Sequence, residues 1–227
     1  MKTPVVVTYS DNYKLLYDNF VSSAQPLALD IVPYKIDFGA NADYGYLSSS
    51  FSTSCYSKVE NVLKFLNESQ APFVISSDID IQFFPNNKSL LDLLFVFTDK
   101  GLDWLGSTES SLSNREFNAG FYIIKNTQKM RSLLRNALQM LKGRRIMLDG
   151  VVINQLIFDT NYDIKYDFIS EDFIKFGLRP IKNKDRLLLH HAVQVSSLTE
   201  KVMLLLQGKA EYLNLPCGTV SLDTQLV

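Results

Sequence analysis

The chain has few cysteines, and this scarcity limits how its fold can be held together. Only Cys55 and Cys217 occur in 227 residues, too few for a disulfide framework and without the spacing of a zinc site. We interpret both as ordinary buried or half-buried thiols. A strong net charge is missing too, because the formal charge is -1 at pH 7, whereas nucleic-acid-binding domains are usually strongly basic. The composition therefore predicts no nucleic-acid partner.

Long hydrophobic runs are also absent. No segment approaches the roughly 20 consecutive apolar residues that a membrane-spanning helix needs, so we expect no membrane span. The opening MKTPVVV lacks the pattern of a secretory signal peptide. We therefore expect a protein of a soluble, reducing compartment, or a domain of a longer protein, because the ending SLDTQLV looks unfinished.

What the chain does have is a regular alternation of apolar patterns. The content is 46% hydrophobic and 12% aromatic, enough for a sizeable core. We expect strands at 4–8, 27–37, 72–83, 103–108 and 120–124, and helices at 10–24, 53–69, 89–100 and 127–143. The later chain predicts helices at 149–160 and 197–213 and strand-like segments at 165–176 and 186–195. This alternation indicates βαβ units, hence an α/β fold with a mainly parallel central sheet flanked by helices.

Polar residues gather where the first three predicted strands end. They are Thr8 with Tyr9 and Ser10, then Asp37, then the pair Asp78 and Asp80. In open α/β sheets, ligands bind beyond the carboxyl ends of the strands. These ends are therefore the first candidates for a binding site.

The pair Asp78 and Asp80 forms a D-x-D motif after an apolar strand. Carboxylates brought together there repel each other and lose hydration, so a positive group should meet them. Carboxylate oxygens suit magnesium and manganese ions. Two alternatives stay open: surface aspartates that start a turn before Pro85, and the nucleophile loop of a haloacid-dehalogenase phosphatase. The second fits less well, because Gln82 stands where that pattern has Thr or Val.

Further motifs follow the D-x-D in a recognisable order. FVISSDIDIQFF, FNAGFYIIKNTQ, MLDGVVINQLIF and LLLHHAV resemble the corresponding motifs of GT-A fold glycosyltransferases that use nucleotide-diphospho-sugars. The similarity is to the branch of bacterial galactosyltransferases and glycogenin and to related small viral or bacterial transferases. It extends from about Pro4 to Val193.

This resemblance implies a Rossmann-like GT-A domain over 1–227, with a nucleotide-binding half of about 1–105 and a sugar- and acceptor-side half of about 106–227. It implies a metal-dependent enzyme that moves a sugar from a UDP-sugar to a glycan, glycoprotein or other hydroxyl acceptor. It also implies a cytoplasmic location, in a bacterium or a virus-infected host cell.

The resemblance also implies roles for individual residues. Asp80 and Asp78 would bind manganese (or magnesium) together with a histidine, and Asp78 would also contact the ribose. The residues implied to hold the nucleotide are Thr8, Tyr9 as a stacking platform, Asn12, Asp37, Lys58 and Asp78. Those implied to line the sugar pocket are Asn118, Ala119, Gly120 and Asp149, with Asn118 and Asp149 as the catalytic candidates.

The histidine ligand is ambiguous, because His190 and His191 are adjacent. On a strand, neighbouring side chains point to opposite faces, so at most one of them is expected to bind the metal. We favour His190, because the family tends to place the ligand directly after the apolar run.

The chain departs from the family pattern at one position. Gly150 stands where the family usually has Gln after the aspartate, so a glutamine nucleophile is out of reach there. Asp149 then has several open roles: nucleophile, general base, sugar ligand, or only the N-cap of a helix. No carboxylate in the motifs is a clear acceptor-side base, Glu116 being the only nearby candidate. We therefore expect retention of anomeric configuration.

Other features allow two interpretations. Arg144 and Arg145 could meet a diphosphate, but solvated loop charges are the commoner explanation. The polar segment 110–116 could border an acceptor. Two alternative functions are a non-catalytic nucleotide-sugar or glycan-binding module on the same fold and a nucleotidyltransferase. The latter needs a glycine-rich loop after the first strand, where this chain has TYSDNYK.

Overall fold

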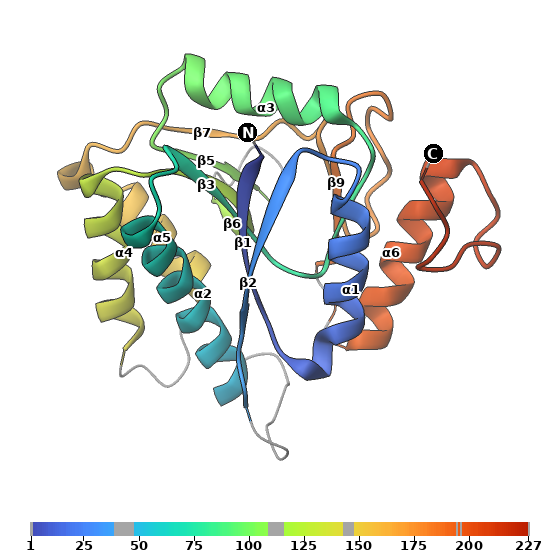
Figure 1. Ribbon diagram of the computed structural model, residues 1–227, viewed down its shortest axis with the longest axis horizontal. Coiled ribbons are helices and arrows are strands. Elements are labelled where there is room, and N and C mark those ends of the chain that lie inside the picture. Colours follow the sequence, from blue (N-terminus) through green and yellow to red (C-terminus); the bar gives the residue numbers. More distant parts are fainter. Residues whose placement is uncertain are drawn as a thin grey trace.

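The computed structural model describes residues 2–38, 48–108, 116–142, 148–193, 195 and 197–226 (Figure 1). Its strands are β1 (Thr3–Tyr9), β2 (Leu29–Lys35), β3 (Phe73–Ser77), β4 (Ile81–Phe83), β5 (Trp104–Ser107), β6 (Asn118–Lys125), β7 (Tyr166–Phe168), β8 (Ile174–Phe176) and β9 (Leu189–His191). Its helices are α1 (Lys14–Ala24), α2 (Ser49–Glu68), α3 (Asn87–Asp99), α4 (Gln128–Leu141), α5 (Asp149–Ile157) and α6 (Leu198–Leu213), with 3-10 turns at Asp11–Tyr13 and Thr160–Tyr162.

The main sheet of the described residues has six strands in the order β2-β1-β3-β6-β5-β7. β1 pairs in parallel with β2 and with β3, and β5 pairs in parallel with β7. Only β6 runs antiparallel to its neighbours β3 and β5. The predicted α/β class, with a mainly parallel sheet between helices, is confirmed.

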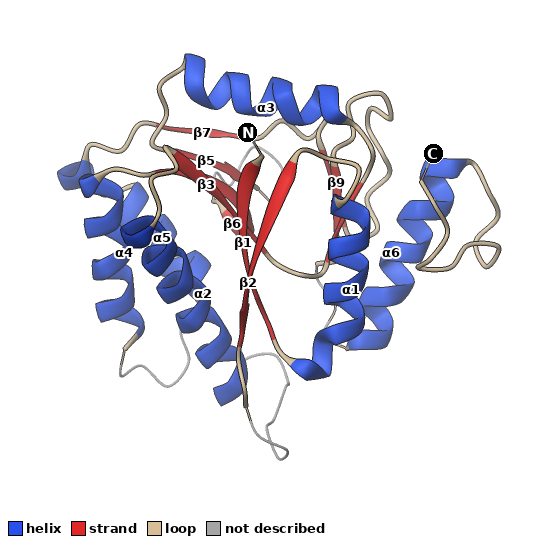
Figure 2. Ribbon diagram, in the orientation of Figure 1, coloured by secondary structure: helices blue, strands red, loops and turns tan. Residues whose placement is uncertain are grey.

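The first five strands in this order, from β2 to β5, supply both faces of the sheet with apolar side chains. On β1, Val5 and Val7 join one hydrophobic cluster and Val6 joins the other, as the two-residue period of a strand requires. The first cluster includes residues of α1 and α3, and the second includes residues of α2, α4 and α5. Figure 2 shows α2, α4 and α5 grouped together, away from α1 and α6. The result is a helix-sheet-helix sandwich.

The helices begin where their sequences provide caps. The side-chain oxygen of Thr127 accepts a hydrogen bond from the backbone N–H of Met130 at the start of α4, and Ser48 does the same for Phe51 at the start of α2. Such caps satisfy backbone donors that the first turn leaves unpaired. The Ser48 cap starts α2 four residues before the predicted boundary at Thr53. Among the described helices, none is long and apolar enough to cross a membrane.

The single strand predicted over 72–83 is in fact two strands. β3 ends at Ser77, and β4 leaves the main sheet for a smaller one of order β4-β9-β8. The break falls at the D-x-D motif, because Asp78 and Asp80 lie between the two strands and belong to neither. The antiparallel pairing of β4 with β9 brings a late part of the chain next to the D-x-D motif. Arg144, Arg145 and segment 110–115 lie outside the described residues.

Candidate functional site

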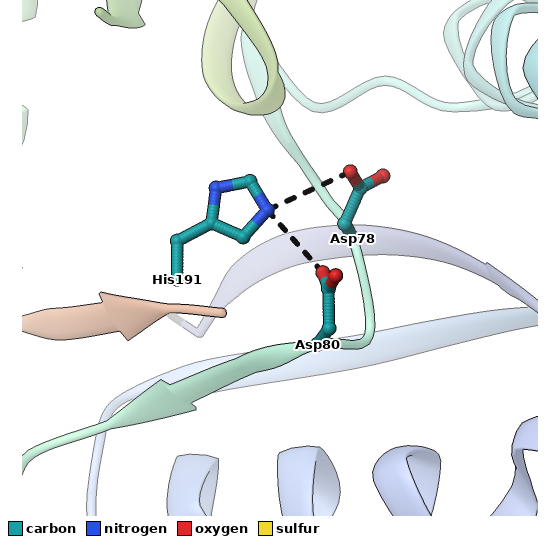
Figure 3. Close-up of side chains that lie close together, drawn as sticks. All are labelled: Asp78, Asp80 and His191. Atoms are coloured by element: carbon teal, nitrogen blue, oxygen red, sulfur yellow. Dashed lines mark ion pairs between the residues drawn. The ribbon is translucent and has the colours of Figure 1, made fainter. Parts of the chain in front are cut away.

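Asp78, Asp80 and His191 come together at the link between β3 and β4. Nε2 of His191 lies 3.3 Å from Oδ1 of Asp80 and 3.8 Å from Oδ2 of Asp78 (Figure 3). One ligand atom from each residue fits within 4.8 Å of the others. Oδ1 of Asp80 is buried and accepts no hydrogen bond from the described residues. Two carboxylates and an imidazole suit a first-row divalent cation, so these residues fit a manganese or magnesium ion.

His190 does not take part in this cluster, so the prediction that His190 is the histidine ligand of the metal is wrong. β9 turns its side chain to the opposite face, where Nε2 lies 3.0 Å from the carbonyl oxygen of Gly177. Burial, followed by the nearby Lys175 ammonium, lowers the pKa of His190 to about 3. The ring is therefore neutral near pH 7, and Nε2–H donates to that carbonyl. The candidate histidine ligand moves from His190 to His191.

Gly120 is what allows the His191 ring to enter the cluster. A Cβ at this position would lie 2.1 Å from Cε1 of His191 and 2.8 Å from Oδ2 of Asp78. Both approaches are far inside van der Waals contact, so any side chain at 120 would displace the two candidate ligands. The glycine of the FNAG motif thus leaves the space that the His191 ring occupies, in addition to any contact with a sugar.

Lys201 provides a positive charge beside the D-x-D motif. This residue of α6 forms an ion pair with Oδ2 of Asp80, and both side chains are largely buried. Burial alone would raise the pKa of Asp80, but Lys201 and His191 outweigh it and hold that pKa well below its usual range. The carboxylate is therefore charged throughout the neutral pH range. Sequence reasoning missed Lys201, because a lysine in the first turns of an amphipathic helix carries no signal of its own.

Lys58 of α2 connects the D-x-D motif to Asp149. Its Nζ lies 2.8 Å from Oδ1 of Asp78 and 2.7 Å from Oδ2 of Asp149, and it donates to the Ala119 carbonyl at 3.1 Å. Burial by itself would lower the pKa of Lys58, but Asp149 and Asp78 outweigh burial and raise it well above its usual value. Lys58 is therefore a fixed positive charge that positions two of the predicted site residues.

Asp149 is the first residue of α5 and is 6% exposed. Its Oδ1 accepts a hydrogen bond of 2.9 Å from the backbone N–H of Gly150, while Oδ2 faces Lys58. The helix-capping explanation is not supported, because the N-cap of α5 is Leu148 and Asp149 is the first helical residue. Asn118 turns inward, and its Oδ1 accepts a 2.7 Å hydrogen bond from the N–H of Gly120.

A cavity of about 720 Å³ joins these groups, a volume within the usual range for small-molecule sites. Its lining includes Asp78, Asp80, His191 and Lys201, and also Lys58, Asn118, Ala119, Gly120 and Asp149. Cys55 also borders it, and burial raises the pKa of this thiol to about 12, so it stays protonated. Cys217, by contrast, is exposed.

Thr8 and Tyr9 also line this cavity. The Tyr9 ring is stacked on Tyr17, with centroids 4.1 Å apart and planes at 11°, which fixes the orientation of the ring. Asn12 and Asp37 are not lining residues, although their chain neighbours Tyr13, Ile36 and Phe38 are. Their assignment to nucleotide binding stays a prediction.

Solved structures of several glycosyltransferases are similar to this chain. GlyE of Streptococcus pneumoniae TIGR4 is 13% identical with a TM-score of 0.58, over 97% of this chain and 66% of that one. A glycosyltransferase involved in glycosylation of the major capsid of PBCV-1 is 9% identical with a TM-score of 0.59, over 88% and 96%. The galactosyltransferase LgtC, in complex with donor and acceptor sugar analogues, is 13% identical with a TM-score of 0.51, over 96% and 98%.

These similarities establish the fold. The chain has the GT-A glycosyltransferase fold that its motifs resemble, and it spans just under two thirds of the length of GlyE. No protein-family model and no curated protein sequence matches it. Activity and substrates therefore have to be argued from the site.

Proposed function

We propose that the protein is a metal-dependent glycosyltransferase that moves a sugar from a UDP-sugar to a hydroxyl group of a glycan or glycoprotein. The observation that carries this proposal is the meeting of Asp78, Asp80 and His191 in the lining of a large cavity on a glycosyltransferase fold. The cluster forms only because His191 of β9 reaches the D-x-D motif. Packing of the hydrophobic core does not require three metal-ligating side chains at one point.

Asp78, Asp80 and His191 would hold manganese or magnesium. The bound ion supplies the positive charge that neutralises a leaving nucleotide diphosphate. Lys201 and His191 keep Asp80 in its charged form, and Lys58 orients Asp78 from the other side. The three side chains are thus prepared for a cation before it arrives, which favours a strong electrostatic contribution.

The remaining residues divide between nucleotide and sugar. Tyr9, held by Tyr17, would stack on the uracil, Thr8 and Asn12 would border the ribose, and Asp37 would accept the imide N–H. Asn118, Ala119, Gly120 and Asp149 would surround the transferred sugar. Lys58 contacts both Asp78 and Asp149, which supports a sugar position directly beyond the diphosphate.

We propose retention of configuration at the transferred carbon. Inversion requires a general base beside the acceptor hydroxyl. Asp149 is buried and paired with Lys58, an arrangement suited to holding sugar hydroxyls. Glu116 lines the cavity and is exposed, which makes it the alternative base if the reaction inverts. Proton NMR of the first product formed, read before anomers equilibrate, decides between the two outcomes.

The central test is a panel of UDP-hexoses and UDP-N-acetylhexosamines, with release of UDP measured in manganese. We expect turnover that stops with EDTA and returns with manganese. Asp80→Asn should lower turnover by about 100-fold or more, as loss of a central electrostatic group does. Asp18→Asn is the matched control, because Asp18 is an exposed aspartate paired only with Lys14 in the contacts described, and it should leave turnover unchanged.

The same panel separates this proposal from the alternative function. A nucleotide-sugar-binding module would bind UDP in the presence of manganese without releasing it from any donor or transferring the sugar. Turnover that is unchanged both by EDTA and by Asp80→Asn would contradict the proposed metal site.

A further inference from the structure

Gly150 occupies a sensitive place in the cavity. It is the second residue of α5, directly after Asp149, and it lines the cavity together with Ala119. Its N–H donates to Asp149 and its carbonyl accepts a 2.7 Å hydrogen bond from the Asn154 side chain. Its backbone is therefore fully engaged in ordinary helix-start contacts that any residue could make.

The backbone conformation does not call for glycine at this position. Glycine is a poor helix former compared with almost any other residue. Among the described glycines, positive φ angles occur at Gly101, Gly177 and Gly218, and Gly150 is not one of them. Neither strain nor hydrogen bonding therefore explains its presence in α5.

Packing against the described residues does not call for glycine either. A Cβ at Gly150 would meet Ala119 Cβ at 3.6 Å as its nearest neighbour, which is ordinary contact. The contrast is with Gly120 and Gly208, where a Cβ would come within 2.1 Å of a histidine ring. A Cβ at position 150 would thus lie against the Ala119 methyl group without a clash, so glycine leaves that part of the cavity lining unfilled.

We infer that Gly150 is a specificity-determining residue that reserves space for a substituent of the transferred sugar larger than a hydroxyl. The inference rests on the proposed function, in which Asp149 and Ala119 surround that sugar. The reserved space adjoins the Ala119 methyl group, so it fits a small group with an apolar end, such as the acetyl of an N-acetylhexosamine. A side chain at position 150 would compete with that group for the same volume.

The test compares Gly150→Ala and Gly150→Leu with the wild type, using UDP-N-acetylglucosamine, UDP-N-acetylgalactosamine, UDP-glucose and UDP-galactose as probes. The wild type should use N-acetylhexosamine donors at least as well as hexose donors. Gly150→Ala should lower the ratio of kcat/KM for the N-acetylated donor over its parent hexose by about tenfold, the discrimination that a methyl-sized group gives. Gly150→Leu should lower it further.

Two measurements exclude a mere folding defect. The Tm of Gly150→Ala should not fall, and the Kd for UDP in manganese should stay within about twofold of the wild type. Gln128→Leu is the control, because Gln128 is an exposed residue in the first turn of α4 that does not line this cavity, and its donor ratio should stay unchanged.

The outcomes distinguish this inference from the proposed function. Wild-type turnover restricted to hexose donors overturns the inference and leaves the function intact. An unchanged donor ratio in both Gly150 variants also overturns the inference and leaves the proposed function intact. A wild type that turns over no UDP-sugar contradicts the proposed function, and the role of Gly150 falls with it.

Discussion

At the scale of single residues, the site is a set of charges that hold one another in place. Lys58 pairs with Asp78 and Asp149, and Lys201 pairs with Asp80. Burying any one of these charges alone would be costly, because a charge without a partner loses its hydration and gains nothing in return. Each lysine therefore supports the folded state as well as the geometry of the cavity.

Lys58→Met tests this mutual support. The variant keeps the length of the side chain but leaves Asp149 buried without its cation. We expect it to lower the free energy of unfolding by about 2 to 4 kcal/mol, measured by urea denaturation without metal. The double variant Lys58→Met with Asp149→Asn should lose less than the sum of the single variants, because the uncompensated carboxylate is gone.

The control for this measurement is Lys14→Met. Lys14 pairs with Asp18 on the surface of α1, with both side chains more than half exposed. Exposed pairs of this kind contribute about 0 to 1 kcal/mol. Equal losses for Lys14→Met and Lys58→Met would mean that burial of the Lys58 network contributes nothing to stability.

At the scale of elements, the docking of α6 decides where Lys201 lies. The helix approaches β9 at Gly208, where a Cβ would meet Nδ1 of His190 at 2.1 Å. Its start is fixed by a capping box, in which Ser197 and Glu200 each bind the other's backbone N–H. The two adjacent histidines thus have separate tasks: His190 seats α6 against the small sheet, and His191 faces the D-x-D motif.

Gly208→Ala is predicted to disturb this docking. The added methyl would overlap the His190 ring, and overpacking of this kind costs about 1 to 3 kcal/mol of stability. His190→Ala should offset part of that cost when combined with Gly208→Ala, because it vacates the overlapped space. Gly150→Ala is the matched control in urea denaturation, since its methyl has room. A purely additive double variant would show that the ring and the helix do not meet there.

At the scale of the whole molecule, the cavity joins distant parts of the chain. Thr8 and Tyr9 come from the first strand, whereas His191 and Lys201 come from β9 and α6 near the other end. A nucleotide diphosphate in this cavity would touch both parts through the metal. We therefore expect manganese to strengthen the binding of UDP, and linkage then requires UDP to strengthen the binding of manganese by the same factor.

Calorimetry checks this linkage and the preference for uracil over other nucleobases. With manganese, UDP should bind at least about tenfold more tightly than CDP, GDP or ADP. In the proposed site the Asp37 carboxylate would accept the N3–H of uracil, a donor that cytosine lacks. Asp37→Asn should reduce that preference, and Asp30→Asn, at an exposed position on β2, should not. Without manganese, or in Asp80→Asn, the affinity for UDP should drop. Tighter binding of GDP than of UDP would contradict the proposal that the site recognises uracil.

Much of the fold could be predicted from local sequence patterns. The 3.6-residue spacing of Met130, Leu133, Leu134 and Ala137 indicates α4, and the alternation in β1 follows the period of a strand. Such patterns depend only on residues close in sequence, so they determine the order of elements. They mislead at 72–83, where apolar residues occur on both sides of the D-x-D motif but the chain changes sheets at Asp78.

The sequence by itself determined the α/β class, the place of the D-x-D motif at a strand end, and the resemblance to GT-A glycosyltransferases. The tertiary structure alone decided that His191 faces the aspartates, that Lys58 joins Asp78 to Asp149, and that Lys201 reaches Asp80 from 121 residues away. The physical reason is that these contacts depend on the pairing register of β4 with β9 and on the seating of α6. Both are set by packing between distant segments, and a shift of one residue in a strand would exchange the faces of His190 and His191.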